Sequence, residues 1–469
     1  MLLILTVLFP ILAGVALSRL SPPAKPMYIL AVLATDALGI AAAIRGGSVT
    51  LFRLTETIPL AFGVDGVSRV FLALALLLYT LGCFYSFAYF SHDPRRNGFF
   101  GFWFASMGAM LAAAMAKNLV SLYLCFEMVT LMSMPMVLHD RTKDAISAAL
   151  KYLFYSIGGA LLGLFAVLTL SFRGAGDFVS GGSISAGDPL LLTAVFAGIV
   201  GFGAKAGMYP LHGWLPAAHP VAPAPASAVL SGIIAKAGIL AVIRLVYFTA
   251  GPALLRGTWV QTAWMILALI TVFMGSMMAW REKILKKRLA YSTVSQLSYI
   301  MLGLSLLCPE GLQGALLHAM AHACAKCALF LCAGVFIHCL DRRRVDELQG
   351  VGRYLPVTVW CFLLSGLSLV GIPPLGGFVS KWSISLAAIE MAPGPFRFLI
   401  PGMLLLSALL TAGYLLPPVI DAFYPPKDGA PEISGERPSL LMVLPLVVLC
   451  CASLAVGLFG TLWIGGIGP

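Results

Sequence analysis

Two apolar stretches interrupted by proline decide the fold: AKAGMYPLHGWLPAAHPVAPAP at residues 204–225 and VGIPPLGGFVSK at residues 370–381. Each contains a lysine and belongs to a long apolar run. Proline lacks a backbone donor and breaks a helix, and a helix broken within a membrane frees backbone groups that can line an ion site. We place the breaks at Pro210 and Pro216 in the first stretch and at Pro373 and Pro374 in the second.

The composition around these stretches is that of a membrane protein. Of 469 residues, 60% are hydrophobic and 10% are charged, whereas soluble domains carry about 25% charged residues. A soluble enzyme, a disordered chain and a disulfide scaffold are therefore excluded. Because the apolar runs are long and continuous, they predict helices rather than the alternating strands of a barrel. We predict an all-α polytopic membrane protein.

The apolar runs predict about fourteen transmembrane helices. A span needs about 20 mainly apolar residues. The first run has no basic segment before it, which indicates an uncleaved helix rather than a signal peptide. The predicted spans lie roughly at 1–17, 27–45, 67–90, 99–115, 119–138, 145–171, 189–208, 224–248, 259–280, 289–308, 311–338, 355–383, 398–420 and 438–463.

The broken spans are the seventh and the twelfth, and their spacing predicts an inverted repeat. An offset of five, an odd number, places the two copies in opposite orientations, as in transporters built from inverted repeats. We therefore divide the chain into N-terminal helices 1–3 at 1–98, a first five-helix repeat at 99–248, a second at 259–425, and a C-terminal helix at 438–469.

The basic residues predict the orientation. Odd-numbered connections hold 17 of the 30 lysines and arginines and even-numbered connections hold 6. Cytoplasmic connections carry the excess of Lys and Arg, so both termini are predicted on the outer face of the cell inner (cytoplasmic) membrane. The membrane also accounts for the net charge of +11, and no nucleic-acid partner is expected.

Five lysines lie inside predicted spans. They are Lys151, Lys205, Lys236, Lys326 and Lys381. Each costs about 2.5–3.5 kcal/mol at the centre of a span, and ionisable residues there indicate an ion or proton path. Lysine suits a proton path better than arginine because it can lose its proton.

Glu127 is the most deeply placed acid of the chain. A lone carboxylate in lipid is neutral, whereas a lysine partner keeps it charged. Two interpretations remain open at this point. Glu127 is either half of a structural ion pair that fixes helix packing or a member of a charge relay.

Three titratable residues share one face of the span at 311–338. His318, His322 and Lys326 are spaced i, i+4 and i+8. Since histidine titrates near neutrality, the stripe predicts proton transfer along the helix. A metal site needs more ligands than two histidines beside a cation, so no metal is predicted.

The remaining polar residues in spans are treated as accessory. Ser292, Gln296 and Tyr299 follow at i, i+4 and i+7, and they either hold waters or join helices. Lys151 stands one turn from Tyr155 and is either a relay member or a snorkelling side chain. The chain has no Walker, GxGxxG or HExxH motif and no iron–sulfur cysteine cluster, so no cofactor is expected on it.

Together these segments resemble a known family. The glutamate in LYLCFEMVTLM and the segments HGWLPAAH, SGIIAKAG, RLAYSTVSQLSYI, HACAKCALF and GIPPLGGFVSK resemble the antiporter-like subunits of respiratory complex I. The same family includes subunits of multisubunit sodium/proton (Mrp-type) antiporters and membrane-bound hydrogenases. The resemblance covers about residues 65–425 and is greatest to a D-type antiporter subunit.

The resemblance implies two inverted five-helix repeats and proton transfer along a central polar axis. It implies that Glu127 pairs with Lys205, that Lys236 is the central carrier, and that Lys381 is the terminal residue of the path. The segment with His318, His322 and Lys326 matches the family's eleventh helix.

The resulting functional prediction is a proton-translocating subunit, with sodium as an alternative ion. Its expected partners are other membrane subunits, including homologous antiporter-like subunits, and lipid. The chain would be a translocase subunit of a redox-driven complex with no redox site of its own. The alternative is a self-standing secondary transporter of a small solute coupled to protons, which would need one central binding site.

Overall fold

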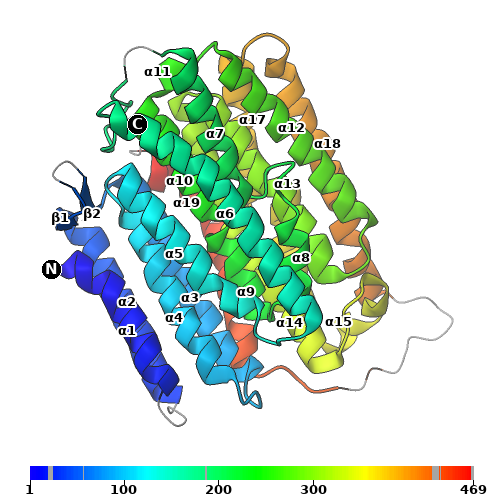
Figure 1. The fold of residues 1–469 in the computed structure, drawn as a ribbon. Coiled ribbons are helices and arrows are strands. Elements are labelled where there is room, and N and C mark those ends of the chain that lie inside the picture. The colour runs from blue at the N-terminus through cyan, green and yellow to red at the C-terminus, as the bar shows by residue number, and fades with distance from the viewer. Residues whose placement is uncertain (20–24, 56–57, 185–186, 425–432, 434, 466–469) are drawn as a thin grey trace.

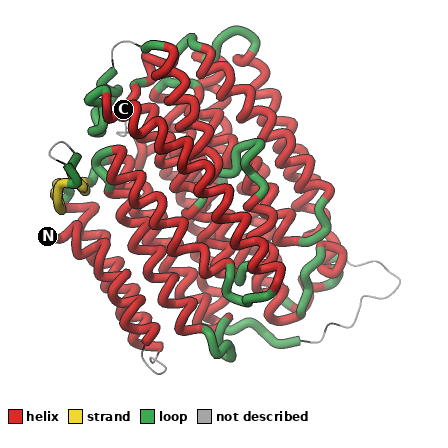
Figure 2. The backbone as a smooth tube through the Cα atoms, in the orientation of Figure 1, coloured by secondary structure: helices red, strands yellow, loops and turns green. Residues whose placement is uncertain are grey.

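A computed structural model describes residues 1–465 apart from 20–24, 56–57, 185–186, 425–432 and 434. Helices make up most of this part and lie side by side in one bundle (Figure 1, Figure 2). Lipid offers no partner to backbone amides, and helices satisfy these groups internally. The predicted all-α membrane fold is confirmed, with one short β-hairpin added to it.

Most helices lie where spans were predicted. The helix at Gly376–Met391 extends eight residues past the predicted end at 383, and the two strands were not predicted. The first half contains α1 (Leu2–Arg19), α2 (Lys25–Arg45), β1 (Ser48–Arg53), β2 (Pro59–Gly63), α3 (Gly66–Tyr89), α4 (Arg96–Met115), α5 (Leu119–Val137), α6 (Lys143–Phe172), α7 (Pro189–Lys205), α8 (Trp214–Val221), α9 (Ala224–Val229), η1 (Leu230–Ile234), α10 (Lys236–Leu245), η2 (Val246–Ala250) and α11 (Pro252–Leu255). The second half contains α12 (Trp259–Arg281), α13 (Leu285–Ser305), α14 (Pro309–Leu340), η3 (Val345–Leu348), α15 (Val351–Tyr354), α16 (Pro356–Val370), α17 (Gly376–Met391), α18 (Phe396–Phe423) and α19 (Leu440–Ile464).

In the described part, 11 helices are long and apolar enough to cross a membrane, and α7 and α16 are shorter apolar helices. Helix α13 falls outside that criterion, and its serine, threonine and glutamine side chains lower its hydropathy. The total of about fourteen spans and the two repeats at 99–248 and 259–425 stay predictions.

Burial separates the centre of the bundle from its outer surface. The segment at 224–250 is completely buried, whereas outer helices expose large apolar side chains such as Phe154 at 77% and Leu405 at 70%. Exposed side chains of this kind suit contact with hydrocarbon rather than water. The polar residues of the site therefore lie inside a layer of apolar helices.

Glycines let α6 and α7 pack closely. A Cβ atom on Gly159 would lie 2.5 Å from the Gly201 carbonyl oxygen, and one on Gly201 would lie 2.3 Å from the Gly159 oxygen. Small residues at such contacts allow helix backbones to approach within a membrane. This contact positions the end of α7, which carries Lys205, beside α6.

The first broken span has one interruption rather than two. Helix α7 ends at Lys205, the chain is non-helical up to the start of α8, and Pro210 lies in that gap. The prediction of a second break at Pro216 is wrong. This residue lies in the first turn of α8, where a backbone N–H has no intrahelical acceptor, so proline does not interrupt the helix. Trp214 Nε1 donates to the Ala204 carbonyl at 3.0 Å and ties the two segments together.

The second broken span agrees with its prediction. Pro373 and Pro374 lie in the gap between α16 and α17. Helix α16 ends at a glycine, Gly371, with φ of +97°, a conformation that glycine adopts without steric cost.

Helix α13 begins four residues earlier than the predicted span at 289. Lys286 and Arg288, assigned to a connection from the sequence, lie inside this helix and are buried. Their charges are compatible with burial because both side chains donate to backbone carbonyls of neighbouring segments. Lys427, also counted for the orientation, lies outside the described residues.

The connections rich in basic residues gather at one end of the bundle, which we call the basic end. Arg95 Nη1 donates to the Asp140 carbonyl at 3.2 Å, and Ile284 forms a β-bridge with Arg344. The start of α1 and the end of α19 lie at the other end, on the side of the β1–β2 hairpin (Figure 1). The hairpin is antiparallel and pairs Ser48 with Gly63.

Candidate functional site

Lys205 ends α7 with its ammonium buried against α5 and α6. Nζ donates to Thr130 Oγ1 and to Tyr152 OH, both at 2.7 Å, and lies 4.6 Å from the centre of the Tyr152 ring. Ser133 Oγ lies 2.7 Å from the same tyrosine hydroxyl. Neutral hydroxyls and a ring face therefore hold this cation.

Glu127 does not contact Lys205 as the resemblance implied. Among the described residues no salt bridge joins the two, and Glu127 Oε1 is buried without a hydrogen-bond partner. The charges remain close enough to interact electrostatically. Thr130, one helical turn after Glu127 on α5, occupies the position beside the ammonium, so the structure shows separated groups rather than a contact pair.

Lys236 begins α10 directly after the π-helix η1. A π-helical turn uses i+5 hydrogen bonds, such as that from the Ala235 amide to the Leu230 carbonyl. Lys236 Nζ donates to the carbonyls of Ser231 at 3.1 Å and Gly232 at 2.6 Å.

Lys236 also contacts a histidine of α14. Its Nζ lies 2.9 Å from His322 Nδ1. Because an ammonium can only donate, His322 accepts through Nδ1 whenever this lysine is protonated. The contact places a proton donor and a proton acceptor side by side.

The α14 stripe is buried but its three members have different partners. His318 Nδ1 lies 2.9 Å from Ser380 Oγ, and the rings of His318 and His322 are 6.2 Å apart. Lys326 Nζ instead donates to the Leu289 carbonyl of α13 at 3.0 Å. The two histidine rings are therefore neighbours, whereas Lys326 extends towards the beginning of α13 at the basic end.

Lys381 lies at the second broken helix. Its Nζ donates to the carbonyls of Leu369 at 2.5 Å and Val370 at 3.1 Å, which are free because a helix leaves its last carbonyls without intrahelical donors. The ammonium lies 4.8 Å from the centre of the Tyr299 ring, and that ring stacks on His318 at 5.2 Å.

These contacts form a continuous buried row. We define the buried row as Lys236, His322, His318, Tyr299 and Lys381. Lys205 adjoins it through the helix backbones, since a Cβ atom on Gly238 of α10 would lie 3.0 Å from Lys205 Cβ.

The accessory residues separate into three groups. Ser292 accepts from Tyr414 OH at 2.7 Å and joins α13 to α18. Both amide atoms of Gln296 are buried and have no hydrogen-bond partner among the described residues. Lys151 is exposed on the outer face of α6, and it and the half-buried Tyr155 do not reach the buried row.

Sequence reasoning missed an ion pair at the end opposite the basic end. Arg244 is 1% exposed and makes two hydrogen bonds to the Asp65 carboxylate, at 2.5 and 2.8 Å, and one to Ser68 Oγ at 3.0 Å. Asp65 also caps α3 by accepting from the Ser68 amide. The signal available in the sequence was an aspartate directly before a span.

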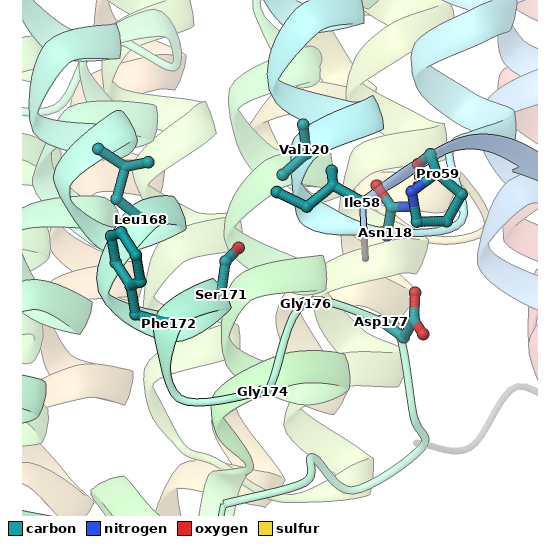
Figure 3. Close-up of a pocket in the computed structure, with 10 residues that line it drawn as sticks. All are labelled: Ile58, Pro59, Asn118, Val120, Leu168, Ser171, Phe172, Gly174, Gly176 and Asp177. Carbon is teal, nitrogen blue, oxygen red and sulfur yellow. Dashed lines mark hydrogen bonds between the residues drawn. The ribbon is translucent and has the colours of Figure 1, made fainter. Parts of the chain in front are cut away.

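A cavity of about 350 Å³ lies where α5 begins and α6 ends. Figure 3 shows Asn118, Phe172 and Asp177 around it, and no residue of the buried row lines it. In the part of the chain that the structure describes, no three His, Cys, Asp or Glu side chains come together as metal ligands would.

Comparisons with known proteins identify the family and the fold. Residues 116–406 match the family described as "NADH:quinone oxidoreductase/Mrp antiporter, TM". NADH-quinone oxidoreductase subunit N of Desulforudis audaxviator is 29% identical, with 98% of this chain and 95% of the relative covered. Hydrogenase-4 component B of Escherichia coli is 34% identical over 70% of this chain, which spans 51% of that relative.

The fold is that of a complex I membrane subunit. A chain in the structure of respiratory complex I from Thermus thermophilus superposes with a TM-score of 0.83 and 23% identity, covering 99% of this chain and 97% of the other. At that identity the likeness establishes the fold, and the family match covers more than half of the sequence. The chain therefore belongs to the NADH:quinone oxidoreductase/Mrp antiporter membrane family.

Proposed function

We propose that this chain is a proton-translocating membrane subunit of a multisubunit complex. The observation that carries the proposal is the buried row, in which titratable side chains follow one another to Lys381 at the second broken helix. Lys205 stands at the corresponding break of the first broken helix. Intramembrane ionisable residues arranged in this way are typical of proton relays.

The partners of the lysines suit reversible proton transfer. Lys205, Lys236 and Lys381 donate to hydroxyls, carbonyls or an imidazole. An ammonium with neutral partners can release its proton without leaving a paired carboxylate stranded in the low dielectric. Each histidine can accept a proton on one ring nitrogen and donate from the other.

The self-standing transporter is the weaker alternative. It requires convergent polar groups around one substrate, whereas the buried lysines here are spread over α7, α10, α13, α14 and α17. The relatives named above are a subunit of a quinone oxidoreductase and a component of a hydrogenase. We propose that this chain likewise assembles with other membrane subunits, homologous antiporter-like ones among them, and carries no cofactor itself.

We propose further that the basic end faces the cytoplasm and that both termini lie on the outer side of the inner membrane. The excess of Lys and Arg in the connections of that end supports this orientation. A cysteine added at the C-terminus should react with an impermeant thiol reagent in intact cells. If the added cysteine reacted only after the cells were permeabilised, the C-terminus would lie in the cytoplasm and the proposed orientation would be wrong.

The functional proposal is tested by Lys236→Met in the assembled complex. Methionine keeps the unbranched side chain as far as Cε but cannot carry a proton, so translocation should fall at least tenfold while assembly is retained. Lys143→Met, at an exposed lysine that begins α6, is the control. Normal translocation by an assembled Lys236→Met complex would refute the proposal, and transport of sodium in its place would identify the alternative ion.

A further inference from the structure

The basic end holds a cavity that the buried row does not explain. It has a volume of about 700 Å³. Its lining includes the acids Asp93, Asp140, Asp341 and Glu347 and the cations Lys286, Arg343 and Arg344. We call this cavity the vestibule. The four carboxylates exceed the three cations by one negative charge when His338 is neutral, which favours cations over anions in the vestibule.

Lys286 forms part of the vestibule lining and lies at its inner limit. The residue is 5% exposed, and its Nζ donates to the Ala222 carbonyl and, at 3.5 Å, to the Pro220 carbonyl. Neither carbonyl has an intrahelical donor because α8 ends at Val221, ahead of the prolines at 223 and 225. The Ala222 carbonyl also accepts from Ser227 Oγ at 3.4 Å. The ammonium therefore lies on the negative end of the α8 dipole, at the boundary between the vestibule and the interior.

His219 lies directly behind this boundary, one residue before Pro220. It is completely buried, and neither ring nitrogen has a hydrogen-bond partner among the described residues. Its ring stacks on Phe330 of α14 at 4.5 Å. A buried imidazole without partners is costly to a fold, so the position calls for an explanation beyond packing.

Lys326 connects this histidine with the buried row. Lys326 lies one turn before Phe330 on α14. Its Nζ donates to the carbonyl of Leu289, a residue that lies one turn after Lys286 on α13. His219 accordingly lies within electrostatic range of both Lys286 and Lys326. Lys326 in turn lies within electrostatic range of Lys236, the first member of the row.

We propose that Lys286 is a movable plug between the vestibule and His219, and that His219 is the first proton acceptor on the way to Lys326. The inference rests on the proposed function, since it takes protons as the cargo. When the Lys286 ammonium leaves the Ala222 carbonyl, water from the vestibule reaches the imidazole. Hydronium gives its proton to the free ring nitrogen, and the opposite N–H passes its proton to the neutral amine of Lys326. One proton enters and one leaves, so the imidazole ends neutral as the other tautomer.

The first experiment measures access and does not depend on transport. In the full chain with Cys451→Ser, which removes the one exposed native thiol of the described part, His219→Cys is treated from the basic end with 2-aminoethyl methanethiosulfonate. Labelling of that peptide is followed by mass spectrometry. With Lys286 present it should be slow, and with Lys286→Met at least tenfold faster.

Lys287→Met is the matched control. Its lysine is the next residue, pairs with Glu282 at 2.8 Å and does not reach the α8 carbonyls. It should leave the labelling rate unchanged. Equal rates with and without Lys286 would overturn the plug. If the Lys286→Met chain does not assemble, Lys286→Gln replaces it and should likewise increase the labelling rate at least tenfold.

The second experiment separates this inference from the proposed function. His219→Phe keeps the stacking on Phe330 but removes both nitrogens, so proton translocation should fall at least tenfold. If Lys236→Met abolishes translocation while His219→Phe translocates normally, the proposed function stands and the assignment of His219 is wrong. If neither variant affects translocation, both proposals fail.

Discussion

Removal of one hydroxyl beside Lys205 provides a quantitative test of how its cation is held. Tyr152→Phe deletes one of the two hydrogen bonds to the ammonium and keeps the ring beneath it. Ser133 retains bonds to backbone carbonyls of its own helix, so no new unpaired hydroxyl is created. The substitution therefore removes one charge-assisted hydrogen bond to the ammonium, together with the neutral hydrogen bond between the Tyr152 and Ser133 hydroxyls.

A hydrogen bond to a charged group contributes about 1.5–3 kcal/mol. Since about 1.4 kcal/mol corresponds to a factor of ten in an equilibrium constant, protonated Lys205 should become about 10- to 100-fold less populated relative to its neutral amine. Thr130→Val, which deletes the other hydrogen bond, should act similarly. Glu127→Gln leaves both hydrogen bonds to Lys205 in place and should reduce the population of protonated Lys205 less than either substitution does.

The assay is proton translocation per turnover by membrane vesicles that contain the assembled complex. Tyr247→Phe is the control, because this tyrosine is equally buried and donates to the Leu304 carbonyl at 2.8 Å, away from the lysine. Translocation should fall in Tyr152→Phe and not in the control. Wild-type translocation by an assembled Tyr152→Phe complex, or an equal loss in Tyr247→Phe, would refute the reasoning.

Three further perturbations test other contacts. Gly377→Ala would place a Cβ atom 1.7 Å from a carbonyl oxygen of α16. We expect this variant to be about 1–3 kcal/mol less stable and to translocate protons more weakly. Gly402→Ala is the control and should change neither property, because a Cβ atom there meets nothing within 4 Å. Asp65→Asn keeps the cap of α3 but leaves the buried Arg244 guanidinium without its counter-charge. Because the Asp65 side chain is 46% exposed, we expect the free energy of unfolding, measured by SDS titration, to fall by only about 1–2 kcal/mol. An unchanged free energy of unfolding would contradict this prediction. Burial raises the pKa of Asp93, but hydrogen bonds, with that to His139 the largest, bring the pKa below its usual value. The carboxylate therefore stabilises the fold above about pH 4 and loses this effect as the pH falls through its lowered pKa, so Asp93→Asn should lower thermal stability at pH 7 and converge with wild type in acid.

The contacts around the lysines depended on tertiary structure. Nothing in the spacing of Glu127 and Lys205 indicated that Thr130 and Tyr152 would bind the lysine ammonium in place of the carboxylate. Lys286 was assigned to a connection because it belongs to a run of charges, and only packing against the end of α8 buries it. His219 was quoted as part of a motif, yet its lack of partners becomes visible only once α13 and α14 surround it.

The sequence by itself determined the membrane class, the places of most helices, the two interrupted spans and the presence of lysines within them. These features are properties of consecutive residues: hydropathy over about 20 positions selects a span, and proline interrupts it locally. The partner of each buried charge was decided by tertiary structure alone. A hydrogen bond such as that between Lys236 and His322 joins residues 86 positions apart, and its geometry follows from how whole helices pack, which no local pattern encodes.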